Sequence, residues 1–234
     1  MLQFFSYLIN GISLGSVYAI IALGYTMVYG ILRLINFAHG DVFMIAGLIM
    51  VYAAASLPLY IAIPLVLVAT VVIGFLIERV AYKPLRSAPR MSVMISAIGV
   101  SYLLQNLALY ITGGLSKMYP TIPFISESVT IGTATTKMVT LITPVLTLVL
   151  VVVLVLFIQK TKIGMAMRAV SKDFETSQLM GIKINSVISA TFIIGSFLAA
   201  VGSLLYFTNY AGVIPTSGAM PGLKAFVAAV FGGI

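Results

Sequence analysis

KTKIGMAMRAVSKDFETSQLMGIKIN, residues 160–185, is the longest hydrophilic interruption in a chain of 234 residues that is otherwise strongly apolar. It holds five of the thirteen basic residues and two of the five acidic ones. A basic loop of this size in a membrane protein is suited to contact another protein in the cytoplasm. The alternative is a solvated connector whose basic residues only mark the cytoplasmic side of the membrane.

The loop contains signals for one short helix. Asp173 is a good N-cap, because its side chain can accept backbone N–H bonds, and Glu175 then lies in the positive first turn. Gly181 can adopt the left-handed conformation that ends a helix. We therefore expect about two helical turns over residues 174–180, roughly 10 Å long.

Two apolar side chains of the loop are four residues apart. Val170 and Phe174 would share one face of a helix at this spacing. That face is a candidate for filling a groove on a partner.

The composition is that of an integral membrane protein. Hydrophobic residues make up 61% of the chain and charged ones 8%, against about 25% charged in soluble domains. The mean hydropathy is +1.17. The net charge of +8 does not indicate a nucleic-acid partner, because the basic residues cluster in two loops. With no Cys and one His, neither disulfides nor a transition-metal site is expected, and the sequence indicates no cofactor.

The apolar stretches predict an all-α, polytopic helical membrane protein, with residues 1–234 forming a single transmembrane domain. Six spans are predicted at residues 8–29, 42–57, 60–77, 91–111, 139–158 and 187–207. Residues 223–234 begin another apolar stretch, which would make seven. Twelve residues are too few to cross a core that needs about 20, so the sequence looks cut before its natural end.

The loops predict the orientation. Residues 78–90 and 160–185 are strongly basic and are expected in the cytoplasm by the positive-inside rule. Two prolines in the first of these loops argue against a continuous helix. Residues 112–138 and 208–221 then lie outside, as does the N-terminus, and residues 128–136 alternate weakly, as a short strand does.

Small residues recur at a spacing of four in two spans, at Gly11, Gly15 and Ala19 and again at Gly195, Ala199 and Ser203. Small residues at this spacing let membrane helices approach closely. We expect both sets to serve helix packing.

The stretch GILRLINFAHGD, residues 30–41, interrupts the apolar region with Asn36, His39, Gly40 and Asp41. Two interpretations stay open. The stretch is either a discontinuity that enters the membrane beside protein or water, or a turn in which Asp41 caps the next helix and His39 lies at the interface. A proton relay through His39 would need a second buried ionisable group near it.

Span 91–111 is the most polar of the six. Its residues Ser92, Ser96 and Ser101 fall roughly on one side, which should face other helices or a watery path. The candidate residues for a substrate path are Asn36, His39, Gly40, Asp41, Ser96 and Gln105.

The chain lacks the chemistry needed to energise transport by itself. It has no GxxxxGK[ST] phosphate loop, so it is not expected to hydrolyse nucleotide. Of its five acidic residues only Asp41 lies near a membrane break, whereas ion-coupled carriers usually need intramembrane ionisable groups. Energy from a separate ATPase is the better interpretation.

Three stretches, residues 14–47, 83–106 and 164–188, resemble permease subunits of branched-chain amino acid ABC importers, the LivH type. The third resembles the coupling motif of ABC importer permeases, with Thr176 and Ser177 in place of two alanines. The resemblance implies a central substrate path, two ATP-binding cassette ATPase subunits, a second homologous permease and an extracytoplasmic binding protein. The residues that it assigns to ATPase coupling are Arg168, Asp173, Phe174, Glu175 and Gly181.

The sequence thus predicts a transport subunit, not an enzyme, in the inner membrane of a bacterial or archaeal cell. Its expected substrates are Leu, Ile and Val, and urea or a short amide is the alternative. An ion-coupled secondary carrier that works through His39 and Asp41 is a third possibility. Transport that survives loss of the membrane potential but stops when ATP is drained would exclude that carrier.

Overall fold

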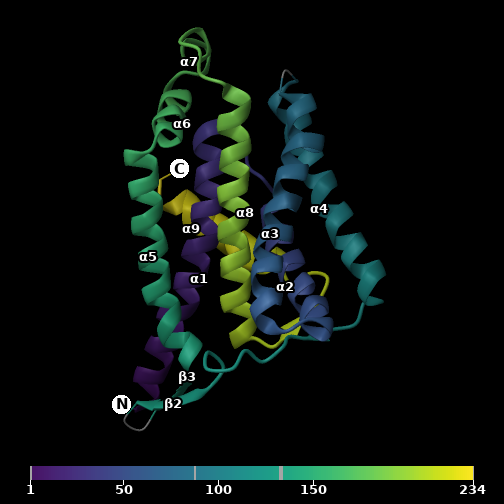
Figure 1. Cartoon of the computed structure of the whole chain (residues 1–234), viewed down its shortest axis with the longest axis vertical. Coiled ribbons are helices and arrows are strands. Elements are labelled where there is room, and N and C mark those ends of the chain that lie inside the picture. Colours follow the sequence, from purple (N-terminus) through teal and green to yellow (C-terminus); the bar gives the residue numbers. More distant parts are fainter. Residues whose placement is uncertain (1, 87, 132–133, 234) are drawn as a thin grey trace.

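The computed structural model describes residues 2–86, 88–131 and 134–233. Within these ranges, six helices are long and apolar enough to cross a membrane (Figure 1). They are α1 (Leu2–Leu32), α2 (His39–Ser56), α3 (Leu59–Ile77), α4 (Arg90–Thr112), α5 (Met138–Lys160) and α8 (Ile184–Asn209). The all-α polytopic fold and the six predicted spans are confirmed, with helix ends shifted by up to six residues at α1 and by three or fewer elsewhere.

Helix α8 is the axis of the bundle, with α1 and α3 on either side of it (Figure 1). Its small residues allow close packing, as predicted. Gly195 and Ala199 are buried, and a Cβ added at Gly195 would lie 3.5 Å from the carbonyl oxygen of Gly24 in α1. The packing role predicted for Gly11 and Gly15 is wrong within this chain, because both are exposed with nothing within 4 Å of an added Cβ.

Helical structure continues past the end of the span that hydropathy predicts for α3. A π-helical turn (η1, Glu78–Tyr82) and a 3-10 turn (η2, Lys83–Leu85) continue it toward α4. The expectation that the two prolines prevent a continuous helix is confirmed, because the helical turns end at Leu85 and α4 begins only at Arg90, after Pro89. Glu78 is fully buried.

Short strands close the end of the bundle opposite helices α6 and α7 (Figure 1). β2 (Ser128–Ile131) and β3 (Ala134–Lys137) form an antiparallel hairpin where the sequence predicted one strand. β1 (Lys117–Met118) pairs with β4 (Gly212–Val213).

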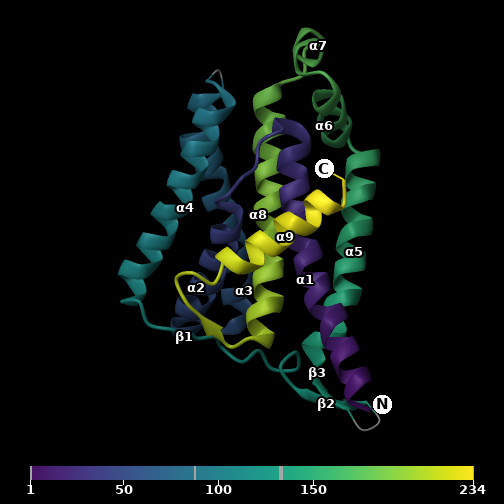
Figure 2. The same cartoon turned by 180° about the vertical axis from the view of Figure 1, so that it is seen from behind.

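The predicted outer loop 208–221 and the apolar stretch after it are divided differently in the structure. Helix α9 (Ala219–Phe231) begins inside the predicted loop, and its 13 residues are too few to span a bilayer. It lies obliquely across α1 and also packs against α2, near the middle of the bundle (Figure 2).

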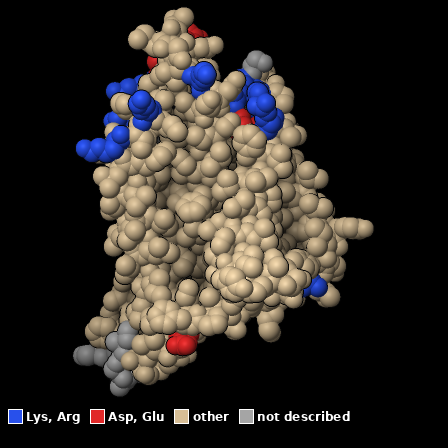
Figure 3. All heavy atoms as spheres, in the orientation of Figure 1, with Lys and Arg blue, Asp and Glu red and all other residues tan. Residues whose placement is uncertain are grey.

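Most basic side chains on the visible face gather at the end of the bundle that carries α6 (Lys162–Lys172) and α7 (Phe174–Leu179) (Figure 3). Both basic loops meet there, since Arg86 in the first donates a hydrogen bond to Asn185 beside the second. Below them, the same face shows a wide band without charged side chains.

We predict that this end is cytoplasmic. Single cysteines replacing Arg90 and Arg168, both exposed, should resist an impermeant thiol reagent added outside intact cells. A cysteine replacing Met118, which is 84% exposed at the opposite end, should react. The chain has no Cys of its own, so labelling reports only the introduced site. Labelling of either arginine position from outside would overturn this orientation.

Candidate functional site

The connection between α1 and α2 turns back into the bundle. α1 ends at Leu32, followed by a left-handed residue, Arg33, with φ of 52°. α2 begins at His39, deep in the molecule, because Asp41 in its first turn contacts Ser101. Ser101 is the twelfth of 23 residues in α4, about 16 Å from that helix's start. The discontinuity interpretation is confirmed, and the surface-turn interpretation is wrong.

Asn36 satisfies one backbone N–H group of this broken segment. Its Oδ1 accepts hydrogen bonds from the backbone N–H of Ala38, at 3.2 Å, and from the hydroxyl of Tyr82, at 2.9 Å. A backbone N–H or C=O group that lacks a hydrogen bond inside a membrane costs roughly several kcal/mol. Asn36 therefore fixes the break and ties it to η1.

Asp41 does not cap α2 but faces α4. Its carboxylate accepts hydrogen bonds from the hydroxyl of Ser101 and from the side-chain amide of Gln105, the latter at 3.0 Å. Gln105 also donates to Ser101 at 3.2 Å. The prediction missed Ser101, although its position in the serine stripe was a signal for it.

These three residues form the polar wall of a cavity of about 330 Å³ between α2, α4 and α9. The other walls are formed by aliphatic residues, glycines and four aromatic rings, which are Tyr25, Phe37, Tyr102 and Phe226. The cavity therefore combines one charged, hydrogen-bonded wall with apolar surroundings at mid-depth in the bundle.

Gly40 lets α9 approach this cavity. A Cβ added at Gly40 would lie 2.6 Å from the carbonyl oxygen of Gly218 and 3.2 Å from the Cα of Gly222. Contacts this short with backbone cannot be relieved by rotating a side chain, so the first turn of α9 depends on glycine at position 40.

The remaining candidates for the substrate path, His39 and Ser96, do not line this cavity. His39 is buried, not at the interface, and its ring meets Tyr25 edge-on with centroids 4.7 Å apart. Its Nε2 has no hydrogen-bond partner among the described residues. Ser96 does not line the cavity, because its hydroxyl donates to the carbonyl of Ala81 at 3.2 Å.

The short helix predicted over residues 174–180 is present as α7 (Phe174–Leu179). Asp173 caps it by accepting hydrogen bonds from the hydroxyl and, at 3.1 Å, the backbone N–H of Thr176, and these bonds lower the pKa of Asp173. Gly181 has φ of 81°, and the N–H of Ile182 donates to the carbonyl of Ser177 at 3.1 Å, which is the Schellman ending.

Helix α6 was not predicted, although its start carries a signal. Thr161 caps it by accepting a hydrogen bond from the N–H of Gly164 at 3.0 Å. α6 ends at Lys172, so the prediction that Val170 and Phe174 share one helical face is wrong. Val170 is buried at the end of α6, whereas Phe174 begins α7.

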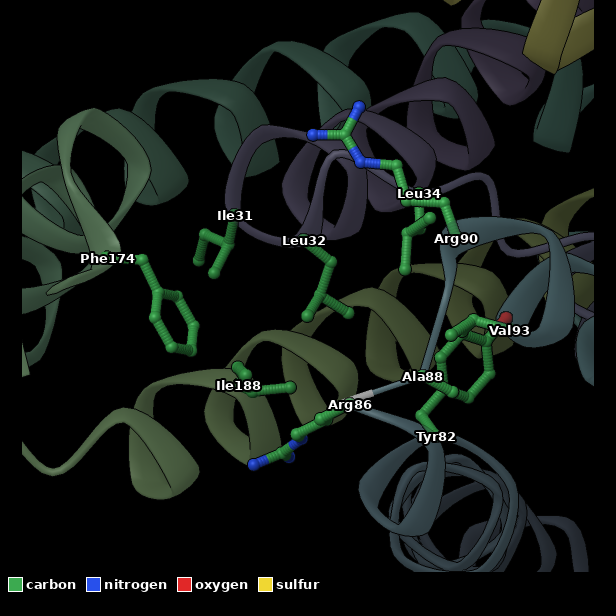
Figure 4. A pocket seen from close by; sticks show the side chains of 10 residues that line it. All are labelled: Ile31, Leu32, Leu34, Tyr82, Arg86, Ala88, Arg90, Val93, Phe174 and Ile188. Carbon is green, nitrogen blue, oxygen red and sulfur yellow. The ribbon is translucent and has the colours of Figure 1, made fainter.

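Phe174 points into a cavity of about 240 Å³ between α7 and the membrane helices, beside Ile31 and Ile188 (Figure 4). Glu175 and Phe174 also line a neighbouring cavity of about 380 Å³ with Arg33 and Arg90. Arg168 lies apart on the exposed side of α6, where it donates to the carbonyl of Gln159 at 3.4 Å.

A buried ion pair that the sequence analysis missed lies behind this surface. Arg86 pairs with Glu78 and also donates to Asn185, while the hydroxyl of Ser189 donates to Glu78 at 2.9 Å. The Glu78 side chain is fully buried and that of Arg86 is 17% exposed. The network joins η1 to the start of α8, directly after α7.

A cavity with one charged wall, set halfway through a bundle of membrane-crossing helices, is the arrangement of a membrane transport permease. The chain belongs to the family described as the branched-chain amino acid transport system permease component, which matches residues 7–234. It is thus a multi-pass membrane protein and a transport component, not an enzyme.

Curated relatives agree with this assignment. The chain is 42% identical to the high-affinity branched-chain amino acid transport system permease protein BraD of Pseudomonas aeruginosa, over 97% of this chain and 78% of that protein. It is 38% identical to the corresponding LivH protein of Escherichia coli K12, over 100% of this chain and 80% of that protein. A ribose import permease protein of Haemophilus influenzae is 26% identical, over 93% of this chain and 66% of that protein. No solved structure matches the chain significantly.

The contact at Gly40 gives a prediction. Gly40→Ala should displace α9 and lower both transport and thermal stability, since overpacking typically costs about 1–3 kcal/mol. Gly99→Ala in α4 is the matched control, because an added Cβ there meets nothing within 4 Å. Substrate uptake and melting temperature of the purified complex measure both effects. Equal behaviour of the two variants would show that α9 does not depend on this contact.

Proposed function

We propose that this chain carries branched-chain amino acids, Leu, Ile and Val, through the inner membrane as the permease of an ATP-driven importer. The observation that carries this proposal is the cavity bounded by Asp41 and four aromatic rings. A carboxylate has lone pairs left after accepting two hydrogen bonds, so Asp41 can also accept from a substrate ammonium group. The rings suit an aliphatic side chain.

The size of the cavity fits small substrates. Its volume of about 330 Å³ is at the low end of small-molecule sites, which span roughly 300–1,000 Å³. The names of the BraD and LivH relatives state branched-chain amino acid transport for those proteins. Neither urea or short amides nor ion-coupled transport is favoured by these relatives.

The proposed partners are two ATPase subunits, a second permease and an extracytoplasmic binding protein. Helix α7 projects from the basic end of the bundle (Figure 1). Its tip exposes large apolar side chains, with Leu179 86% and Met180 79% exposed. Apolar groups that project past the basic rim of a membrane protein favour contact with another protein over contact with lipid or water. We assign this tip to the ATPase.

Motion of α7 has a continuous route to the cavity. α7 leads within a few residues to Asn185, which holds Arg86 and through it Glu78. Glu78 begins the π-helical turn that ends with Tyr82, and the hydroxyl of Tyr82 donates to Asn36 at the break. We propose that this chain of contacts transmits ATPase motion to the first turn of α2.

The function is tested by reconstituting the complex with its ATPases and binding protein in proteoliposomes. We expect uptake of L-leucine that requires ATP and persists after the membrane potential is collapsed. Urea should not compete. Uptake driven by an ion gradient without ATP, or uptake of urea but not of leucine, would contradict the proposal.

The coupling role of α7 gives a second prediction. Gly181→Val should strain the left-handed helix ending by about 1–2 kcal/mol or more and tilt or lengthen α7. The variant should insert normally but lose co-purification with the ATPase, or lose ATP turnover stimulated by loaded binding protein.

Gly113→Val is the matched control. Gly113 ends α4 with φ of 66°, and an added Cβ there also meets nothing within 4 Å. The backbone strain is therefore similar, but it lies far from α7. Coupling should survive in this variant. Normal ATPase association and normal stimulated ATP turnover in Gly181→Val would show that residues 160–185 only connect α5 to α8.

A further inference from the structure

Helix α9 places a lysine about halfway along the membrane-crossing helix α1. The Nζ of Lys224 lies 5.8 Å from the centroid of the Tyr18 ring. Tyr18 is the seventeenth of the 31 residues of α1, a membrane-crossing helix. Lys224 is therefore near mid-depth, in agreement with the position of α9 in Figure 2. The sequence analysis did not select it, although it lies in the apolar stretch of residues 223–234.

The side chain of Lys224 is exposed on the outer surface of this single chain. Its neighbours on α9 are apolar and also exposed, with Leu223 at 57% and Val227 at 41%. Among the described residues the one ion pair is that of Glu78 and Arg86, so no carboxylate of this part of the chain neutralises Lys224.

Lipid cannot surround this ammonium group. Half of a hydrocarbon core about 30 Å thick is about 15 Å, a distance that the four-carbon stem of lysine cannot cover to reach the headgroups. Intramembrane ionisable residues almost always face the bundle interior or a water-filled cavity and find a counter-charge there. The ring of Tyr18 compensates part of the charge but supplies no anion.

The helix that carries Lys224 also forms a wall of the Asp41 cavity. Gly222, Leu223 and Phe226 of α9 line that cavity, and Lys224 directly follows Leu223. A single short helix thus adjoins the carboxylate of Asp41 with one face and presents an ammonium on a different face, since Lys224 does not line the Asp41 cavity. A path that passes both faces of α9 would meet the two charges in turn, and these match the two ends of a zwitterionic amino acid.

We propose that Lys224 lines the translocation path and binds the carboxylate group of the amino-acid substrate while that substrate crosses the membrane. This inference rests on the proposed function, in which Asp41 accepts from the substrate ammonium. It adds the specificity-determining residue for the carboxylate end and defines the face of α9 that borders water.

The test uses Lys224→Cys in the assembled complex, since this chain has no Cys of its own. Loss of a charged hydrogen bond should lower L-leucine uptake about ten- to hundredfold. ATP turnover stimulated by loaded binding protein should persist. Treatment with 2-aminoethyl methanethiosulfonate, which restores an ammonium at this position, should recover uptake. The neutral ethyl reagent should react without recovering it.

Val227→Cys is the matched control, one turn further along the exposed face of α9. It should transport normally before and after either reagent. The complex with the unaltered chain, treated with both reagents, controls for cysteines of the partner subunits.

Three results would overturn the inference. Lys224→Cys could transport leucine normally, or both reagents could restore uptake equally, which would indicate filling of space and not charge. The variant could also fail to assemble until the ammonium is restored, which would assign Lys224 to an ion pair with a partner subunit. Failure of the proposed function is distinct, because then the unaltered complex itself would not take up leucine.

Discussion

The helix break between α1 and α2 is the constraint on which the rest of this structure depends. A chain that turns back inside a membrane exposes backbone groups that lipid cannot satisfy. Asn36 satisfies one of them and is itself held by Tyr82. The break brings Asp41 against α4 and Gly40 against α9. The cavity exists because this one segment is held in place by hydrogen bonds within the chain.

Contacts also connect this break to the end of the bundle that carries α7. Tyr82 belongs to the π-helical turn whose first residue, Glu78, pairs with Arg86, and Arg86 donates a hydrogen bond to Asn185 at the start of α8. Removing one partner of a buried ion pair typically costs about 3–5 kcal/mol, so this connection is stiff as long as both charges remain. A stiff connection transmits a displacement instead of absorbing it. The residues that hold the break in place are therefore also suited to transmit motion to it.

Local signals predicted the parts of this structure that local forces determine. Hydropathy located six spans, and Asp173 with Gly181 located α7, because a cap and a left-handed ending involve only neighbouring residues. Tertiary contacts were not predictable in this way. From its sequence neighbours Glu78 looks like a loop residue, whereas in the structure Arg86 and α8 bury it. Likewise, the residues around Ser96 and Ser101 do not indicate which serine contacts Asp41.

The central claim is that the break borders the substrate path, and accessibility of Phe37 tests it most directly. Phe37 lines the cavity and is 38% exposed, whereas Val149 in α5 is 51% exposed on an apolar membrane-crossing helix. With each replaced by cysteine in the assembled complex, a water-soluble thiol reagent should modify position 37 but not 149. Leucine delivered by its binding protein should slow the reaction. A cysteine at position 37 as inert as one at 149 would contradict the account.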